Sequence, residues 1–189
     1  MKILVTRHGQ TNWNVIGKLQ GQTDIELNDT GRLQAIETGK LIKNEKIDLI
    51  ITSPLKRAKE TAEIINKNFN VTIIEDKRLM ERYWGKSEGL TKEQIKEQKR
   101  ENPLVDDVWN YNKNVEFNNM ENMHDFCKII YEFLDEIMSK YKDNNILLVT
   151  HGGVSVPIKS YCMKYPLEKI VDREEIKGLK NCEVYSYVE

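Results

Sequence analysis

Val-Thr-Arg-His-Gly at residues 5–9 and Val-Thr-His-Gly-Gly at residues 149–153 decide the fold of this chain. Each stretch ends a short apolar run, Ile3 to Thr6 in the first case and Asn145 to Thr150 in the second. Short apolar, β-branched runs that stop at a turn residue are typical of buried strands. We therefore expect two strands, each followed at its carboxyl end by a histidine.

Strands and helices alternate along most of the chain. Further strands are predicted at Asp48 to Thr52, at Asn70 to Ile74 and, plausibly at a sheet edge, at Cys182 to Val188. Helices are predicted at about Gly31 to Lys43, at Leu55 to about Lys67 and on the apolar periodicity from Phe126 to Ile137. This alternation predicts an α/β fold with a mostly parallel sheet.

Two polar segments indicate where helices begin. Residues 28–30, Asn-Asp-Thr, offer caps for the first predicted helix. In the second, Ser53 can cap the helix and Pro54 can take its first position. Arg57 would then lie in the opening turn.

Length and composition restrict the class of protein. The chain has 189 residues, a net charge of -1 and three cysteines without a C-x-x-C pattern. One domain spanning 1–189 is expected, with no disulfide framework and no zinc cluster. The charge gives no general attraction to nucleic acid or to a membrane, and no signal peptide or spanning segment is evident. We expect a cytoplasmic protein; its oligomeric state stays open.

Residues 83–122 interrupt the alternation. They are polar and rich in Asn, Lys and Glu, with a helical patch around Lys92 to Arg100 that Pro103 should end. We interpret them as an excursion from the core, and we expect substrate specificity to reside there.

Charged side chains gather at the strand ends of the predicted sheet. In parallel sheets, ligands lie beyond the carboxyl ends of the strands. The candidates that follow the four successive strands are Arg7 and His8, then Arg57, then Glu81, then His151. Four distant segments should therefore converge on one crevice.

Such a crevice suits a phosphoryl group. The guanidiniums of Arg7 and Arg57 match phosphate geometry, and a helix N-terminus adds positive charge. Asn14 and Gln20, in the loop after His8, can supply uncharged donors. The positive charge is present without a metal, so we expect neither a metal nor another cofactor.

A histidine among these cations suggests covalent catalysis. Like charge should lower the pKa of His8 and keep one ring nitrogen available for attack on phosphorus. Glu81 could protonate the leaving group and then activate water, although it could instead accept from Arg82 or Arg78. His151, if protonated, would stabilise the transition state. Gly9, Gly152 and Gly153 could be turn residues with positive φ.

The sequence resembles the histidine phosphatase superfamily, in its phosphoglycerate mutase-like branch. The matching pieces are Thr6 to Asn14, Leu19 to Gly21, Leu27 to Ala35, Ser53 to Ala62, Leu79 to Gly89 and Val149 to Gly153. R-H-G alone would be weak support, but the whole set in this order is strong.

The resemblance implies a role for each site residue. His8 would be the phosphorylated histidine, Glu81 the proton donor, and the phosphate pocket would consist of Arg7, Arg57 and His151. Asn14 and Gln20 correspond to further phosphate contacts, and Gly152 is added as a substrate-binding candidate. A three-layer α/β/α fold follows as well, with the excursion partly roofing the site.

Two features bear on the reaction. The chain lacks an evident basic, proline-rich insertion and C-terminal tail, which favours a phosphatase of small phosphate monoesters over a phosphoglycerate mutase. Glu81-Arg82-Tyr83-Trp84 resembles the mutase pattern, so Arg82 could bind a substrate carboxylate or second phosphate. Mutase activity and a catalytically idle phospho-ligand-binding module stay open as alternatives.

Overall fold

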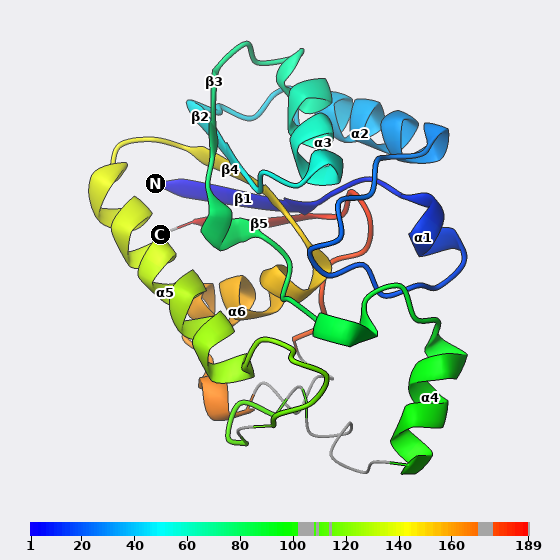
Figure 1. The fold of residues 1–189 in the computed structure, drawn as a ribbon. Helices are drawn as coiled ribbons and strands as arrows, with labels where there is room; N and C mark the ends of the chain where they lie inside the picture. The colour runs from blue at the N-terminus through cyan, green and yellow to red at the C-terminus, as the bar shows by residue number, and fades with distance from the viewer. Residues whose placement is uncertain (102–107, 109, 114, 170–175, 189) are drawn as a thin grey trace.

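A five-stranded mixed sheet forms the centre of the computed structural model, which describes residues 1–101, 108, 110–113, 115–169 and 176–188. Its strands are β1 (Lys2–Arg7), β2 (Leu49–Thr52), β3 (Thr72–Glu75), β4 (Ile146–Thr150) and β5 (Val184–Val188). Their order is β3-β2-β4-β1-β5 (Figure 1). Strands β1 to β4 run parallel, and β5 pairs antiparallel with β1 at the edge. The mostly parallel sheet is confirmed.

Helices cover both faces of this sheet (Figure 1). The α-helices are α1 (Asn12–Val15), α2 (Asp29–Leu41), α3 (Lys56–Asn66), α4 (Lys92–Glu101), α5 (Met123–Lys140) and α6 (Gly152–Cys162). Short 3-10 helices are η1 (Lys77–Leu79), η2 (Gly85–Ser87) and η4 (Leu167–Lys169). Helices α2 and α3 pack together on one side, and α5 and α6 on the other. The α/β/α layering is therefore confirmed.

Alternation along the central strands divides the core into two apolar layers. In β1, Ile3 and Val5 pack with α5 and α6, whereas Leu4 packs with α3. Helix α5 contributes Phe126, Ile130, Phe133, Leu134 and Ile137, all at most 3% exposed. Burying a side chain of this size contributes about 1.5–3 kcal/mol. Both faces of these strands are covered, and for that reason each strand could be predicted from a continuous apolar run.

The register of the sheet aligns two strand ends. Arg7 at the end of β1 lies opposite Thr150 at the end of β4. The backbone N–H of His8 donates to the carbonyl of Thr150 at 2.9 Å. The residues that follow β1 and β4 therefore leave the sheet side by side.

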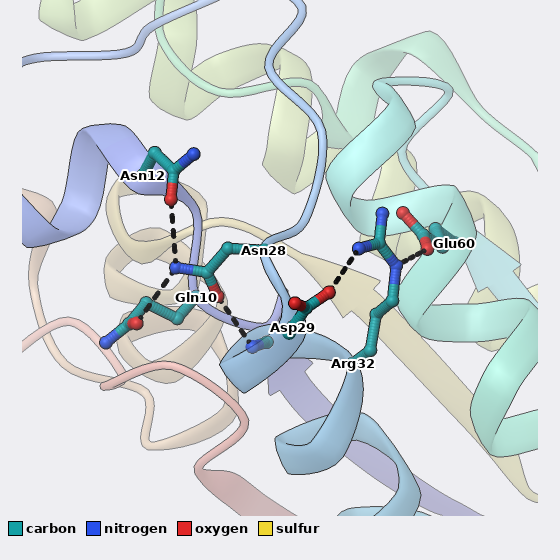
Figure 2. A network of polar contacts seen from close by, with 7 residues as sticks. Gln10, Asn12, Asn28, Asp29, Arg32 and Glu60 are labelled. Carbon is teal, nitrogen blue, oxygen red and sulfur yellow. Dashed lines mark hydrogen bonds and ion pairs between the residues drawn. The ribbon is translucent and has the colours of Figure 1, made fainter.

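The loop after His8 rests on the first turn of α2, as Figure 2 shows. Asn28 caps α2 by accepting from the N–H of Gly31 at 2.8 Å, and its amide nitrogen donates to Gln10 at 3.0 Å. A Cβ on Gly31 would lie 2.1 Å from the carbonyl oxygen of Gln10. Arg32 joins α2 to α3 through Glu60 at 2.6 Å.

The predicted start of α3 was wrong by about two residues. The helix begins at Lys56 with Leu55 as N-cap, so Ser53 is not its cap and Pro54 is not its first residue. The hydroxyl of Ser53 instead accepts from the N–H of Leu55 at 3.3 Å and lies 2.8 Å from a ring nitrogen of His151. Arg57 still lies in the opening turn, as predicted.

The excursion after Glu81 is tied to the loop that follows α1. The N–H of Leu19 donates to Leu90, and the N–H of Gly89 donates back to Leu19, at 2.9 and 2.8 Å. The predicted helical patch is α4, and Pro103 lies outside the described residues. Among the helices of the described ranges, none is long and apolar enough to cross a membrane.

Candidate active site

Two histidine rings lie together where β1 and β4 end. The ring centroids of His8 and His151 are 5.2 Å apart, with the planes tilted by 57°. The side chains are almost fully buried, at 2% and 0% exposure. The sequence predicted that these two strand ends converge on one point, and the structure confirms this.

The hydrogen bond of His8 fixes its tautomer. Nδ1 lies 2.7 Å from the carbonyl oxygen of Gly9, which can only accept, so Nδ1 carries the proton. Burial, and then the charges of Arg57 and Arg7, hold the pKa of His8 well below its usual 6.5. The ring is therefore neutral at physiological pH and Nε2 presents a lone pair. Burial outweighs the like charge on which the sequence argument relied.

Arg57 is fully buried and held by a loop of the chain. Its two terminal nitrogens donate to the carbonyls of Thr23 and Gly21 at 2.8 and 2.6 Å. Burial lowers its pKa to about 10, so the guanidinium keeps its charge at neutral pH. Its Nε is buried and has no hydrogen-bond partner among the residues that the structure describes.

Glu88 organises the loop that holds Arg57, and sequence reasoning did not single it out. Its carboxylate accepts from the backbone N–H groups of Gln22 and Thr23, both at 2.9 Å, and from the Thr23 hydroxyl. It also accepts from the N–H of Trp84 at 3.1 Å. Gly21 has φ +53, and a Cβ there would lie 2.1 Å from Glu88. The only available signal was the Ser-Glu-Gly at residues 87–89.

Arg7 contributes a second guanidinium with a donor to spare. One terminal nitrogen donates to the carbonyl of Leu179 at 3.2 Å, and the buried Nε has no partner in the described part of the chain. Asn181, from the same C-terminal segment, donates to the carbonyl of His8 at 2.9 Å. No local sequence pattern predicts this contact, because it joins residues more than 170 positions apart.

Glu81 is held by two backbone N–H groups. Its carboxylate oxygens accept from Arg82 and from Gly153, each at 3.0 Å. Its charge acts on Arg7 and Arg57, whose pKa values it raises against the stronger lowering by burial. The alternative partner Arg78 pairs with other carboxylates, as given by its contacts to Asp76 and Glu136. Glu81 therefore lies beside Arg7 and Arg57. Together with His8 and His151, these residues are called the cluster below.

Gly9 and Gly153 are needed for the close approach of other atoms, and the interpretation of Gly9, Gly152 and Gly153 as residues with positive φ was wrong. Gly9, Gly152 and Gly153 are not among the residues with positive φ. A Cβ on Gly153 would lie 2.2 Å from Glu81, and one on Gly9 would lie 2.4 Å from the Gly31 carbonyl. Gly152 lies in the first turn of α6, where a Cβ would touch the guanidinium of Arg7 at 3.4 Å.

Arg82 is occupied elsewhere. It is 1% exposed, and its three guanidinium nitrogens donate to the backbone carbonyls of Val108 and Glu121. The guanidinium also lies 4.9 Å from the centroid of the Trp84 ring. In this arrangement Arg82 fastens the excursion rather than joining Arg7 and Arg57.

The remaining predicted contacts lie in the loop between β1 and α2. Asn14 forms a capping box with Thr11, which engages its side-chain oxygen. Gln20 is 8% exposed, and no described residue pairs with its Oε1. Asn14 also lines a cavity of about 400 Å³ together with Arg7, Gly17, Lys18, Leu19, Ile95 and Asn181.

Unsatisfied buried atoms mark the centre of the cluster. Within the described residues, the buried polar side-chain atoms without a partner are Arg7 Nε, Gln20 Oε1, Arg57 Nε and His151 Nδ1. All four belong to residues predicted for the phosphate site. Buried polar atoms are normally paired, so a ligand with acceptor oxygens would satisfy the arginine nitrogens. No group of three or more potential metal ligands occurs in the same part of the chain.

Comparison with known proteins gives a consistent family. A model of the histidine phosphatase superfamily (branch 1) matches residues 3–187. The chain is 39% identical over 151 residues to the uncharacterized phosphatase PhoE of Bacillus subtilis, covering 80% of this chain and 72% of PhoE. It is 37% identical over 160 residues to phosphoglycerate mutase-like protein 4 of Arabidopsis thaliana, covering 81% and 67%.

A solved structure gives the same result. The complex of mycobacterial glucosyl-3-phosphoglycerate phosphatase with VO3 superposes with a TM-score of 0.84 at 26% identity, covering 98% of this chain and 91% of that one. This chain therefore belongs to the histidine phosphatase superfamily, branch 1.

Proposed function

We propose that the protein hydrolyses phosphate monoesters of small molecules through a phosphohistidine on His8. The observation that carries the proposal is a buried, neutral imidazole with its Nε2 lone pair available, among two arginines that each keep an unpartnered Nε. A lone pair on nitrogen suits attack on phosphorus, and fixed cations suit the charge of the phosphoryl oxygens.

In the first step the phosphoryl group lies against Arg7, Arg57 and His151. Asn14 and Gln20 donate to the remaining oxygens. Nε2 of His8 forms a bond to phosphorus while the bond to the ester oxygen breaks. In the complex with the phosphate ester Glu81 carries a proton, which it gives to that oxygen, and the oxygen leaves as an alcohol.

In the second step water replaces the alcohol. Glu81, now a carboxylate, takes a proton from water as the water oxygen bonds to phosphorus. The nitrogen–phosphorus bond breaks, and its electron pair returns to Nε2 of His8. Inorganic phosphate leaves, and neutral His8 and protonated Glu81 are restored, so the step balances.

The leaving group would occupy the cavity beside Arg7. At about 400 Å³ its size is typical of small-molecule sites. Lys18 adds a cation to its wall, and Leu19 and Ile95 add apolar surface. These features support small, negatively charged phosphate esters, a class that includes the compound named for the mycobacterial phosphatase.

The contacts of Arg82 support a phosphatase over a mutase. The mutase alternative gives this guanidinium a substrate carboxylate or second phosphate to bind. Its nitrogens already donate to the carbonyls of Val108 and Glu121. Hydrolysis requires no such second anchor.

Rapid-quench analysis tests the function. With radiolabelled p-nitrophenyl phosphate we expect an acid-labile, base-stable phosphoenzyme that forms and decays at the rate of phosphate release. Turnover without that species would refute the phosphohistidine. With 3-phosphoglycerate, an isomerised product in place of inorganic phosphate would establish the mutase alternative, and no turnover across a metabolite panel would favour the idle binding module.

Glu81→Gln tests the proton donor through its leaving-group dependence. We expect kcat to fall by about 10²–10⁴-fold for an alkyl ester such as glycerol phosphate, because the alkoxide must be protonated. The loss should be much smaller in phosphoenzyme formation from p-nitrophenyl phosphate, whose phenolate leaves without help. Glu121→Gln is the matched control, since Glu121 is a nearby carboxylate that accepts from the N–H of Tyr83. Equal losses with both esters would remove Glu81 from this role.

A further inference from the structure

Ser53 joins the ends of β2 and β4 through a side chain that the proposed reaction has not used. It follows β2 directly, is fully buried, and its backbone N–H donates to Val149 at 3.0 Å. Its hydroxyl oxygen lies 2.8 Å from Nε2 of His151. The ring of His151 is equally buried, and its other nitrogen, Nδ1, has no partner within the described ranges.

The proton count at this hydroxyl decides which nitrogen of His151 carries hydrogen. A serine hydroxyl has one proton to donate and two lone pairs that accept. The oxygen of Ser53 already accepts from the N–H of Leu55 at 3.3 Å. Within the described residues, the acceptor placed to receive its proton is Nε2 of His151. The opposite arrangement, with hydrogen on Nε2, would leave a buried hydroxyl proton without that acceptor.

We propose that Ser53 is a positioning residue that donates to Nε2 of His151 and so keeps the hydrogen of the neutral ring on Nδ1. Nδ1–H is then a hydrogen-bond donor with a fixed direction within the buried cluster. That this donor binds a phosphoryl oxygen rests on the function proposed above, whereas the tautomer itself does not.

The other tautomer would work against an anionic ligand. It would present the Nδ1 lone pair to oxygens that also carry lone pairs, and the two would repel. Burial, and then the neighbouring groups Arg57, His8 and Arg7, lower the pKa of His151 well below 6.5. A neutral donor with a fixed direction is what these surroundings allow. The sequence argument gave His151 its role only on the condition that the ring is protonated, and burial opposes that condition.

The ring of His151 is held by a residue outside the helix that it precedes. The backbone of His151 is the N-cap of α6, and its side chain makes no capping hydrogen bond there. The ring is instead held by a hydroxyl from the neighbouring strand end, where Thr52 of β2 lies opposite Val149 of β4. Removing that hydroxyl should free the ring to exchange tautomers.

Nitrogen-15 NMR of the imidazole rings in the full-length protein reads the tautomer directly. We expect His151 in the wild type to show a protonated Nδ1 and an unprotonated Nε2, and a mixture of tautomers in Ser53→Ala. Vanadate should bind about tenfold more weakly to the variant, and kcat should fall about 10- to 100-fold with p-nitrophenyl phosphate. If Ser53→Ala folds badly, Ser53→Cys takes its place in the test, because it keeps the side-chain volume but donates poorly. We expect it to show the same mixture of tautomers and the same loss of kcat.

Thr52→Val is the matched control. It removes a neighbouring buried hydroxyl whose hydrogen-bond acceptors, within the described residues, are the carbonyls of Ser53 and Val149 rather than the ring of His151. Its tautomer and kcat should match the wild type. Hydrogen on Nε2 in the wild type, or unchanged kcat in Ser53→Ala and Ser53→Cys, would overturn the proposal. Absence of phosphoenzyme in the wild type would instead refute the proposed function and leave the tautomer result intact.

Discussion

Replacing His8 by alanine should reduce kcat by about 10⁴-fold or more and abolish the trapped phosphoenzyme, because the nucleophile of the first step is lost. His124→Ala is the matched control. This third histidine lies at the start of α5, half-exposed and stacked on Tyr111, outside the cluster. Both variants are compared by rapid quench and steady-state phosphate release. Undiminished turnover in His8→Ala would point to a contaminating phosphatase or to a binding module.

The same histidine should leave a signature in the pH dependence of stability. Its pKa in the folded protein is well below 6.5, the ordinary value of a histidine in an unfolded chain. Below pH 6.5 the unfolded state therefore binds more protons than the folded state, and stability is lost as the pH falls. Denaturant unfolding at pH 7.5 and at pH 5 should show a smaller decrease for His8→Ala than for the wild type.

The main features of the site could be predicted because they lie at strand ends. Arg7, His8 and His151 directly follow two buried apolar runs, and parallel strands place their carboxyl ends at one edge. Arg57 could be placed because a helix follows β2 within a few residues. In each case a local pattern and one topological rule sufficed.

The remaining features depend on contacts between segments that no local pattern joins. Glu88 supports the loop at Gly21 across more than 60 positions, and Asn181 reaches the carbonyl of His8 across 173. Ser53 is a residue type that often caps helices, which is why a cap was predicted there. Its hydroxyl instead lies beside a histidine 98 residues away. Arg82 was proposed as a ligand group because its motif resembles the mutase pattern, whereas the carbonyls that engage it lie in the irregular excursion, where no local pattern predicts them.

Arg57→Lys should lower kcat/KM by about 10²–10³-fold while leaving the protein folded. The two terminal nitrogens of the guanidinium donate to the carbonyls of Gly21 and Thr23, which leaves Nε–H to donate to the ligand. A single ammonium cannot reproduce this fork, so it would satisfy either the loop or the phosphoryl group. Leaving one of these buried carbonyls unpaired costs about 1–3 kcal/mol, which the fold should tolerate at moderate temperature.

Arg32→Lys separates this effect from the general cost of losing a guanidinium. Arg32 bridges Asp29 and Glu60 on the protein surface, at 3.2 and 2.6 Å, and lies outside the cluster (Figure 2). Exposed ion pairs contribute little to stability, so this variant should keep its kcat/KM. Vanadate inhibition should weaken in Arg57→Lys alone. If Arg57→Lys loses stability and activity in proportion, with vanadate affinity of the folded fraction unchanged, Arg57 supports the loop around Gly21 and does not bind the phosphoryl group.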